Sequence, residues 1–204
     1  MASFNNDRSL SPSISSDGKK IFFSSNRDTD GKQAIWQCTR GADNKWSEPV
    51  EMTRQISSTA NEWSVHLSDL GNMFVCSWRP GGKGKCDGWR IPFSEGKFGQ
   101  AKNLAVMNTA GLDCGVVPGP KEKYVIFHSS RSGGNGKMDM YISMALADGK
   151  WSEPRNLGPE INGPKNDAGP WISFDGKYLF FTSNRTGSPD IYWVETTAFL
   201  PVPN

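Results

Sequence analysis

The sequence repeats one short phrase four times, and this repeat constrains the fold more than any other feature. The phrase is an apolar and aromatic run that ends in arginine, at Arg27, Arg79, Arg131 and Arg185. The intervals are 79 − 27 = 52, 131 − 79 = 52 and 185 − 131 = 54 residues. Repeats of this length are typical of folds that stack one supersecondary unit several times. The four units account for nearly all of the 204 residues.

Each unit has the pattern of a four-stranded antiparallel meander. Asp17-Gly18 and Asp175-Gly176 are pairs favoured in tight hairpins, and each precedes an apolar run with adjacent aromatics. A Gly-rich or polar loop follows, and then a strand that carries one aromatic residue, at Trp36, Trp89, Tyr141 or Tyr192. The next strand contains "WSEP" in two units. Proline is tolerated in a sheet mainly at an edge, so this strand is placed outermost.

These units predict a β-propeller. A meander with two apolar faces cannot bury both of them alone, and radial stacking of several meanders covers them. No segment has a sustained helical period, which excludes helical solenoids, and a β-sandwich would not need such a repeat. We therefore predict one all-β domain over residues 1–204, a propeller of four four-stranded blades with about 52 residues per blade. The blades are expected at residues 7–52, 61–104, 113–157 and 167–200.

The fourth unit ends early, which leaves the closure of the ring open. After "DIYWV" only the tail "ETTAFLPVPN" remains. Residues 196–200 could supply the missing outer strand, or residues 1–6 could pair with the last blade. We expect a monomer, but an unclosed ring would let two chains share one larger ring, since four blades are at the lower limit for closure.

The composition excludes several classes of function. The net charge is +2, so no nucleic-acid partner is expected. No run approaches the ~20 apolar residues of a membrane span, and the first residues lack the pattern of a signal peptide. We expect no cofactor and no metal site, because there are only two histidines and "DTDG" at residues 28–31 lacks the other ligands of a calcium loop.

The cysteines leave the redox compartment open. None of the four has the C-x-x-C spacing of a zinc or redox motif. Cys76 and Cys86 flank one loop, where a cross-strand bridge is conceivable, but we expect Cys38, Cys76, Cys86 and Cys114 to be small buried thiols.

The repeat units resemble the TolB-like propeller repeats, a WD-repeat-like group. The resemblance rests on "SSDGKKIFFSSNR", "SFDGKYLFFTSNR", "DIYWV" and "WSEPRNLGPEIN", and it extends over nearly the whole chain. Units two and three depart from it with "SDLGNMFVCSWR" and "PGPKEKYVIFHSSR". The resemblance implies a propeller and an extracytoplasmic location, periplasmic or secreted. It implies no single activity, because such repeats occur in binding modules and in saccharide-active enzymes.

The recurring charged residues are expected to be structural. Partly exposed ion pairs of this kind contribute ~0.2–1 kcal/mol. The Gly-rich loops lack the G-x-x-x-x-G-K-[ST] motif of a phosphate-binding loop, so we expect them to be hairpin connections between strands. The expected pairs, each across the loop of one blade, are Arg79 with Asp87, Arg131 with Asp139 and Arg185 with Asp190.

Candidate chemistry lies at the starts of the innermost strands. Alignment of the units places Asp167 in register with Asp113 and Asn61, and Glu62 adjoins the last of these. In a propeller these starts lie near one mouth of the central channel. We therefore expect the carboxylates of Glu62, Asp113 and Asp167 to converge there. Alternatively, such residues only bond to nearby backbone, as is common before a strand.

Three further residues complete the predicted ligand site. Trp63 and His66, together with Glu62, are the places where unit two departs most from its sister units, and Trp171 lies nearby in unit four. Scaffold positions should repeat, whereas a ligand breaks the equivalence of the blades, so such departures indicate a binding site. His128 stands where the other units have Ser, Cys or Thr, and we expect it to be a core histidine.

Two functions are compatible with this pattern. The main prediction is a ligand- or partner-binding module with a polar, acidic site at the channel mouth that takes a small molecule, a glycan or a peptide. The alternative is a small saccharide-active enzyme, of glycosidase or lyase type. In that case Glu62 would be the acid and Asp113 or Asp167 the base, with carboxylates ~5–9.5 Å apart. A channel between only four blades is narrow, which favours binding.

Overall fold

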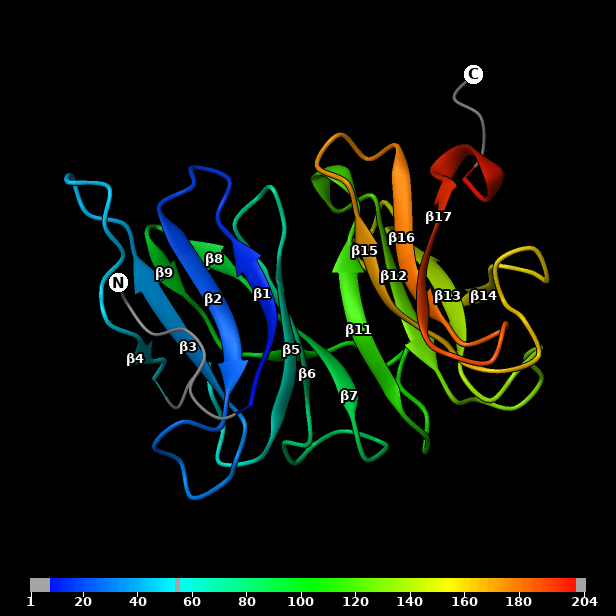
Figure 1. The fold of residues 1–204 in the computed structure, drawn as a ribbon, viewed down its shortest axis with the longest axis horizontal. Coiled ribbons are helices and arrows are strands. Elements are labelled where there is room, and N and C mark those ends of the chain that lie inside the picture. The colour runs from blue at the N-terminus through cyan, green and yellow to red at the C-terminus, as the bar shows by residue number, and fades with distance from the viewer. Residues whose placement is uncertain (1–7, 54–55, 201–204) are drawn as a thin grey trace.

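The computed structural model describes residues 8–53 and 56–200. They form four antiparallel sheets around a common axis, which is a four-bladed β-propeller and confirms the predicted fold (Figure 1). The only helical elements in these two ranges are the 3-10 turns Pro120–Glu122 and Thr196–Ala198. In the same ranges no helix is long and apolar enough to cross a membrane.

The strands of each blade follow one another outward, and β1, β5, β11 and β15 lie toward the middle of the molecule (Figure 1). Blade 1 contains β1 (Ser9–Ile14), β2 (Lys20–Ser25), β3 (Ala34–Thr39) and β4 (Val50–Glu51). Blade 2 contains β5 (Glu62–Leu67), β6 (Met73–Ser77), β7 (Asp87–Ile91) and β10 (Lys102–Asn103), with a hairpin of β8 (Phe93–Ser94) and β9 (Lys97–Phe98) inserted. Blade 3 contains β11 (Asp113–Pro118), β12 (Tyr124–Ser129), β13 (Asp139–Met144) and β14 (Arg155–Asn156). Blade 4 contains β15 (Asp167–Ile172), β16 (Tyr178–Ser183) and β17 (Asp190–Glu195).

Blade 4 has three strands among the described residues. The expectation that residues 196–200 add a fourth strand is wrong, because the chain makes a 3-10 turn at Thr196–Ala198 and then buries Phe199 in the core between blades 3 and 4. The Phe199 carbonyl accepts a hydrogen bond from Arg155 Nη2 at 2.8 Å, which holds this turn against blade 3. The other candidate for closure, residues 1–6, lies outside the described residues.

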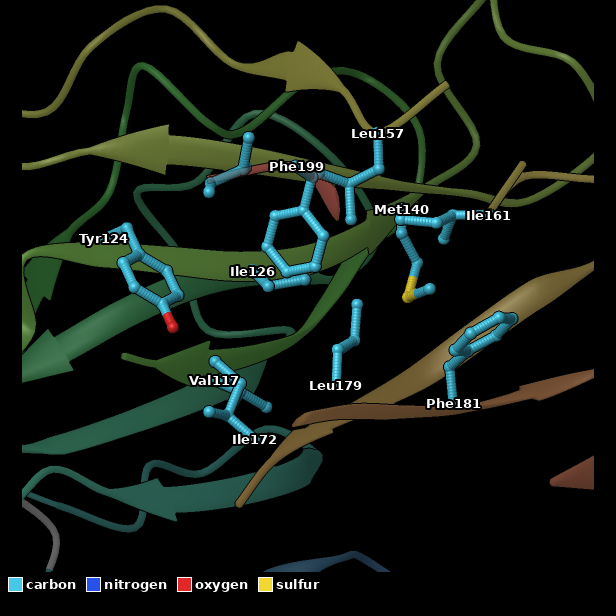
Figure 2. Packing of buried hydrophobic residues seen from close by; sticks show 11 residues of the cluster. Val117, Tyr124, Ile126, Met140, Leu157, Ile161, Ile172, Leu179, Phe181 and Phe199 are labelled. Atoms are coloured by element: carbon cyan, nitrogen blue, oxygen red, sulfur yellow. The ribbon is translucent and has the colours of Figure 1, made fainter. Parts of the chain in front are cut away.

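Apolar clusters join each blade to the next. Phe22, Phe74 and Ile126 are equivalent residues of the second strands in blades 1 to 3, and each is buried against the following blade. Figure 2 shows the third junction, where Ile126 and Met140 of blade 3 lie close to Leu179 of blade 4. Because every buried Å² of apolar surface contributes about 25 cal/mol, these junctions are a main source of stability.

Each innermost strand carries a β-bulge, a local irregularity of register, where it pairs with the second strand. In β11 and β15 a glycine with positive φ lies at the bulge, 63° at Gly115 and 62° at Gly169. That conformation favours glycine, and a bulge changes the direction in which neighbouring side chains point. Both glycines line the central pocket described below.

A disulfide joins blades 2 and 3. It links Cys86 to Cys114, whose Cα atoms are 6.2 Å apart, whereas Cys38 and Cys76 are free and buried. The expectation of buried thiols therefore holds for Cys38 and Cys76 and is wrong for the other two. The Asp113 backbone N–H donates to the Cys86 carbonyl at 2.8 Å, so the start of β11 lies beside the end of the blade 2 loop. This contact between blades brings the two sulfurs together.

Candidate functional site

The three predicted carboxylates lie in buried ion pairs, each within its own blade. The exposed fraction is 0% for Glu62, 1% for Asp113 and 0% for Asp167. The arginine Nη2 to carboxylate oxygen distances are 3.0 Å for Arg79–Glu62, 2.9 Å for Arg131–Asp113 and 2.8 Å for Arg185–Asp167. The recurring arginine therefore joins the second strand to the start of the first.

The predicted pairing of these arginines with Asp87, Asp139 and Asp190 is wrong. Asp87 Oδ2 accepts a hydrogen bond from the Lys83 backbone N–H at 2.6 Å, and Asp139 Oδ1 accepts one from the Gly136 N–H at 3.0 Å. Both aspartates thus close the Gly-rich loop that precedes them. Loop N–H groups satisfy these carboxylates locally, so the arginines are free to pair elsewhere.

The hydrogen bonds around Asp113 satisfy its carboxylate within blade 3. It accepts hydrogen bonds from Thr109 N at 2.6 Å, from Thr109 Oγ1 at 2.7 Å and from Ser129 Oγ at 2.6 Å, in addition to the Arg131 pair. None of the three predicted carboxylates is among the residues that line the two central pockets. A general acid must reach the proton it transfers, so this geometry gives the glycosidase alternative no support.

A pocket of about 700 Å³ lies where the four innermost strands meet. Aromatic and imidazole side chains form much of its wall, namely Trp63, Trp78, Trp171, His66 and His128. Two prolines, two serines, two glycines, a leucine and the interblade disulfide form the remainder, and no Asp, Glu, Lys or Arg is among the described residues that line it. Pockets of 300–1,000 Å³ with mostly apolar walls are typical of small-molecule sites.

The tryptophans form accessible stacking surfaces. The rings of Trp63 and Trp78 have centroids 5.7 Å apart, and the Arg8 guanidinium lies 5.0 Å from the Trp63 centroid. Trp78 is 46% exposed and Trp171 is 42% exposed. A molecule entering from solvent can therefore reach these rings without a rearrangement of the blades.

Three of the six predicted site residues lie together on this wall, namely Trp63, His66 and Trp171. The sequence comparison does not single out Trp78, although it stands directly before the recurring arginine where the other units have Asn or Ser. His128 is half-buried and lines the same wall, so the expectation of a core histidine is incomplete. All five aromatic and imidazole residues of the wall share one sequence signal, which is that the other blades have a different residue at the equivalent position.

Both pocket histidines are uncharged at neutral pH. Burial lowers the pKa of each to about 4, and repulsion by His128 contributes further at His66. His128 Nδ1 accepts a hydrogen bond from the Gly169 N–H at 3.3 Å, so the neutral ring carries its proton on Nε2. The pocket therefore presents hydrogen-bonding groups without net charge.

We expect the protein to lose stability as the pH falls from 6.5 to 4. The folded-state pKa of His66 and His128 lies below the ordinary value of 6.5, so the unfolded chain binds more protons in this window. The loss should be on the order of 1–2 kcal/mol per histidine by pH 5. Urea unfolding at pH 7 and pH 5 measures it, and His128→Gln should shrink the difference. An equal pH dependence in the wild type and the variant would contradict this assignment.

A second pocket of about 360 Å³ adjoins the first. It shares Pro12, His66 and Trp171 with the larger pocket and ends among Ile14 and Phe174. His66 and Trp171 therefore border both spaces.

Comparison with known proteins establishes the fold. No family model matches the sequence, and no curated protein matches it. TolB from Acinetobacter baumannii is 20% identical over 95% of this chain with a TM-score of 0.65. A putative TolB from Agrobacterium tumefaciens is 19% identical over 95% of it with a TM-score of 0.63. A puromycin hydrolase is 12% identical over 93% of it with a TM-score of 0.60.

The chain spans 42%, 60% and 27% of the length of these three proteins. At such identities the likeness shows the fold and not an activity. The chain has a TolB-like β-propeller fold, as its repeats predict.

Proposed function

We propose that this protein is a binding module whose site is the central aromatic pocket, and that its ligand is uncharged and presents a flat apolar ring. One observation carries this proposal. Trp63, Trp78 and Trp171 each occupy a position where other blades have a different residue, and all three border one cavity. A purely structural role would not require such differences between blades.

The chemistry of the wall selects the ligand class. Indole rings stack on other rings and on the apolar faces of sugars, and they bury large areas with few rotatable bonds. A charged ligand would lose its hydration in this pocket, because no Asp, Glu, Lys or Arg is among the described lining residues, both histidines are neutral, and the nearby Arg8 guanidinium already lies against the Trp63 ring. Neutral aromatic molecules, neutral glycan units and apolar peptide side chains all satisfy these conditions.

We also propose an extracytoplasmic location. The Cys86–Cys114 disulfide supports it, since structural disulfides persist mainly in oxidising compartments. Growth in a host with an oxidising compartment and in one with a reducing cytoplasm, followed by thiol counting, tests whether the bond forms in each.

The proposed function is tested with indole and its anionic analogue indole-3-acetate, together with neutral methyl glycosides, in thermal-shift and fluorescence titrations. We expect a neutral compound to bind and indole-3-acetate to bind more weakly. Trp171→Ala should weaken binding about tenfold or more, which corresponds to about 1.4 kcal/mol. Trp193→Ala is the matched control, because Trp193 is 62% exposed and lies outside both pockets.

Two results would contradict the proposal. One is equal weakening by Trp171→Ala and Trp193→Ala, which would place the binding outside the pocket. The other is a preference for indole-3-acetate over indole, which would show that a positive charge recognises the ligand.

A further inference from the structure

His128 occupies a position that links neighbouring blades. Ser24 of blade 1 and Cys76 of blade 2 stand at the equivalent places, three residues before the recurring arginine. Ser24 Oγ donates a hydrogen bond to the Glu62 carbonyl of blade 2, and the Cys76 thiol lies beside the Gly115 N–H of blade 3. Each of these small side chains therefore joins the second strand of its blade to the innermost strand of the next.

In blade 3 one nitrogen of the imidazole makes this contact. His128 lies on β12 opposite Cys114, and its Nδ1 accepts the hydrogen bond from the Gly169 N–H of blade 4. Because a serine and a cysteine occupy this place in blades 1 and 2, the link between blades does not require an imidazole. The second ring nitrogen, Nε2, is therefore not explained by the architecture.

The β-bulge of β11 makes room for the ring. A Cβ atom added at Gly115 would lie 2.6 Å from His128 Nδ1 and 2.8 Å from its Cε1, which is closer than a real side chain can approach. Glycine at this place thus serves two purposes, since it also adopts a φ of 63°. The ring is held in one orientation, by packing against β11 and by its hydrogen bond to β15.

The Nε2–H group of His128 is a donor that the pocket can offer to a ligand. Because Nδ1 is the acceptor and burial lowers the pKa of the ring to about 4, the neutral ring carries its proton on Nε2 at pH 7. Within residues 8–53 and 56–200 no atom accepts a hydrogen bond from Nε2, and Nε2 is not one of the unpaired buried polar atoms there. His128 lines the central pocket, so this N–H is accessible from it.

The other polar side chains of the pocket do not have so definite a role. Ser64 Oγ is buried, so a ligand does not reach it. His66 has no hydrogen-bond partner in the described part of the chain, so no neighbour fixes which of its nitrogens carries the proton. In mostly apolar pockets a few placed polar groups fix the orientation of the ligand. Here the group with a fixed orientation and a fixed proton is His128.

We infer that the ligand of the central pocket is a neutral aromatic ring with a hydrogen-bond acceptor at its edge, such as a ring nitrogen or a ring carbonyl, which pairs with His128 Nε2–H. The inference rests on the proposed function, because it specifies the ligand of the same pocket. A ring without an acceptor would leave the donor unpaired in a largely apolar wall, and this loss weakens its binding. His128 is thus the residue that determines specificity, while the tryptophans supply the stacking surfaces.

Quinoline, isoquinoline and naphthalene test the inference, because they have the same size and shape and differ in the ring nitrogen. At pH 8 we expect the wild type to bind at least one of the two nitrogen compounds about tenfold or more tightly than naphthalene. His128→Phe should abolish this preference, whereas His128→Gln keeps an N–H donor and should retain it. Thr182→Val is the matched control, since Thr182 is the equivalent residue of blade 4, lines neither pocket and should leave the preference intact.

A second measurement needs no substitution. In the wild type, the NMR signal of His128 Nε2–H should shift more with the preferred nitrogen compound than with naphthalene at equal saturation. Unfolding midpoints establish that the variants are folded. A preference that survives in folded His128→Phe, or one that is lost in His66→Phe instead, would overturn the assignment to His128.

The outcomes also separate this inference from the proposed function. Equal binding of the three compounds, weakened alike by Trp171→Ala, would overturn the inference and leave the proposed function standing. The same holds if none of the three binds while indole or a methyl glycoside does. Failure of every neutral ring compound to bind would overturn both.

Discussion

Replacement of Glu62 by glutamine is expected to lower the free energy of unfolding by about 3–5 kcal/mol, the range for removal of one partner of a buried ion pair. Glu62 is fully buried, and the side chain of its partner Arg79 is 8% exposed. Glutamine keeps the shape but removes the charge, so the guanidinium is left buried and uncompensated. The Ser58 N–H and Oγ, which donate to Glu62 Oε1 at 2.9 and 2.5 Å, would also face a weaker acceptor.

Urea unfolding at pH 7 measures this loss. Asp190→Asn is the control, because Asp190 is exposed in blade 4 and its change should shift the free energy of unfolding by less than about 0.5 kcal/mol. A catalytic acid would behave differently, since its replacement abolishes turnover while stability changes little. A Glu62→Gln variant as stable as the parent would show that the ion pair is not structural.

Removal of the interblade disulfide should cost about 3–4 kcal/mol of stability. The bond links residues 28 positions apart, and a closed loop of that length restricts the unfolded chain by about this amount. The Cys86→Ala/Cys114→Ala variant should therefore unfold at a lower denaturant concentration than the oxidised wild type.

The reductant dithiothreitol provides the internal control for that variant. It should lower the unfolding midpoint of the wild type toward that of the double variant and leave the variant unchanged. The buried thiols Cys38 and Cys76 are present in both proteins, so any effect of dithiothreitol that acts through them is the same in the wild type and in the double variant. An unchanged midpoint of the wild type after reduction would show that the bond contributes nothing to stability.

The repeat alone predicts the blades, because adjacent apolar residues such as Phe22 and Phe23 must be covered on both faces of a sheet. The closure of the ring does not follow from the repeat. Residues 196–200 could continue as a strand by pattern, but Phe199 gains more by burial between blades 3 and 4. Whether residues 196–200 form a strand or a turn depends on the tertiary packing of blades 3 and 4 around Phe199, and a local sequence pattern does not show that packing.

The candidate site likewise has features that the sequence predicts and features that it does not. Trp63, His66 and Trp171 are found by asking where a unit departs from its sisters, and the structure places them on one wall. The alignment with Asn61 is wrong, because Glu62 pairs with Ser77 as Asp113 pairs with Ser129 and Asp167 with Ser183. The three carboxylates therefore occupy equivalent positions, and each has the recurring arginine as its partner. The Cys86–Cys114 bond depends on a contact between blades, which spacing along one chain cannot show.

The most direct measurement of ligand binding at the central pocket is an NMR titration of the eight tryptophan indole N–H signals with indole or the best neutral ring compound. We predict that the signals of Trp63, Trp78 and Trp171 shift with one shared saturation curve. The signals of the five other tryptophans should stay in place. Saturable shifts confined to tryptophans outside the pocket, or no saturable shift with any neutral ring compound, would contradict the proposed function.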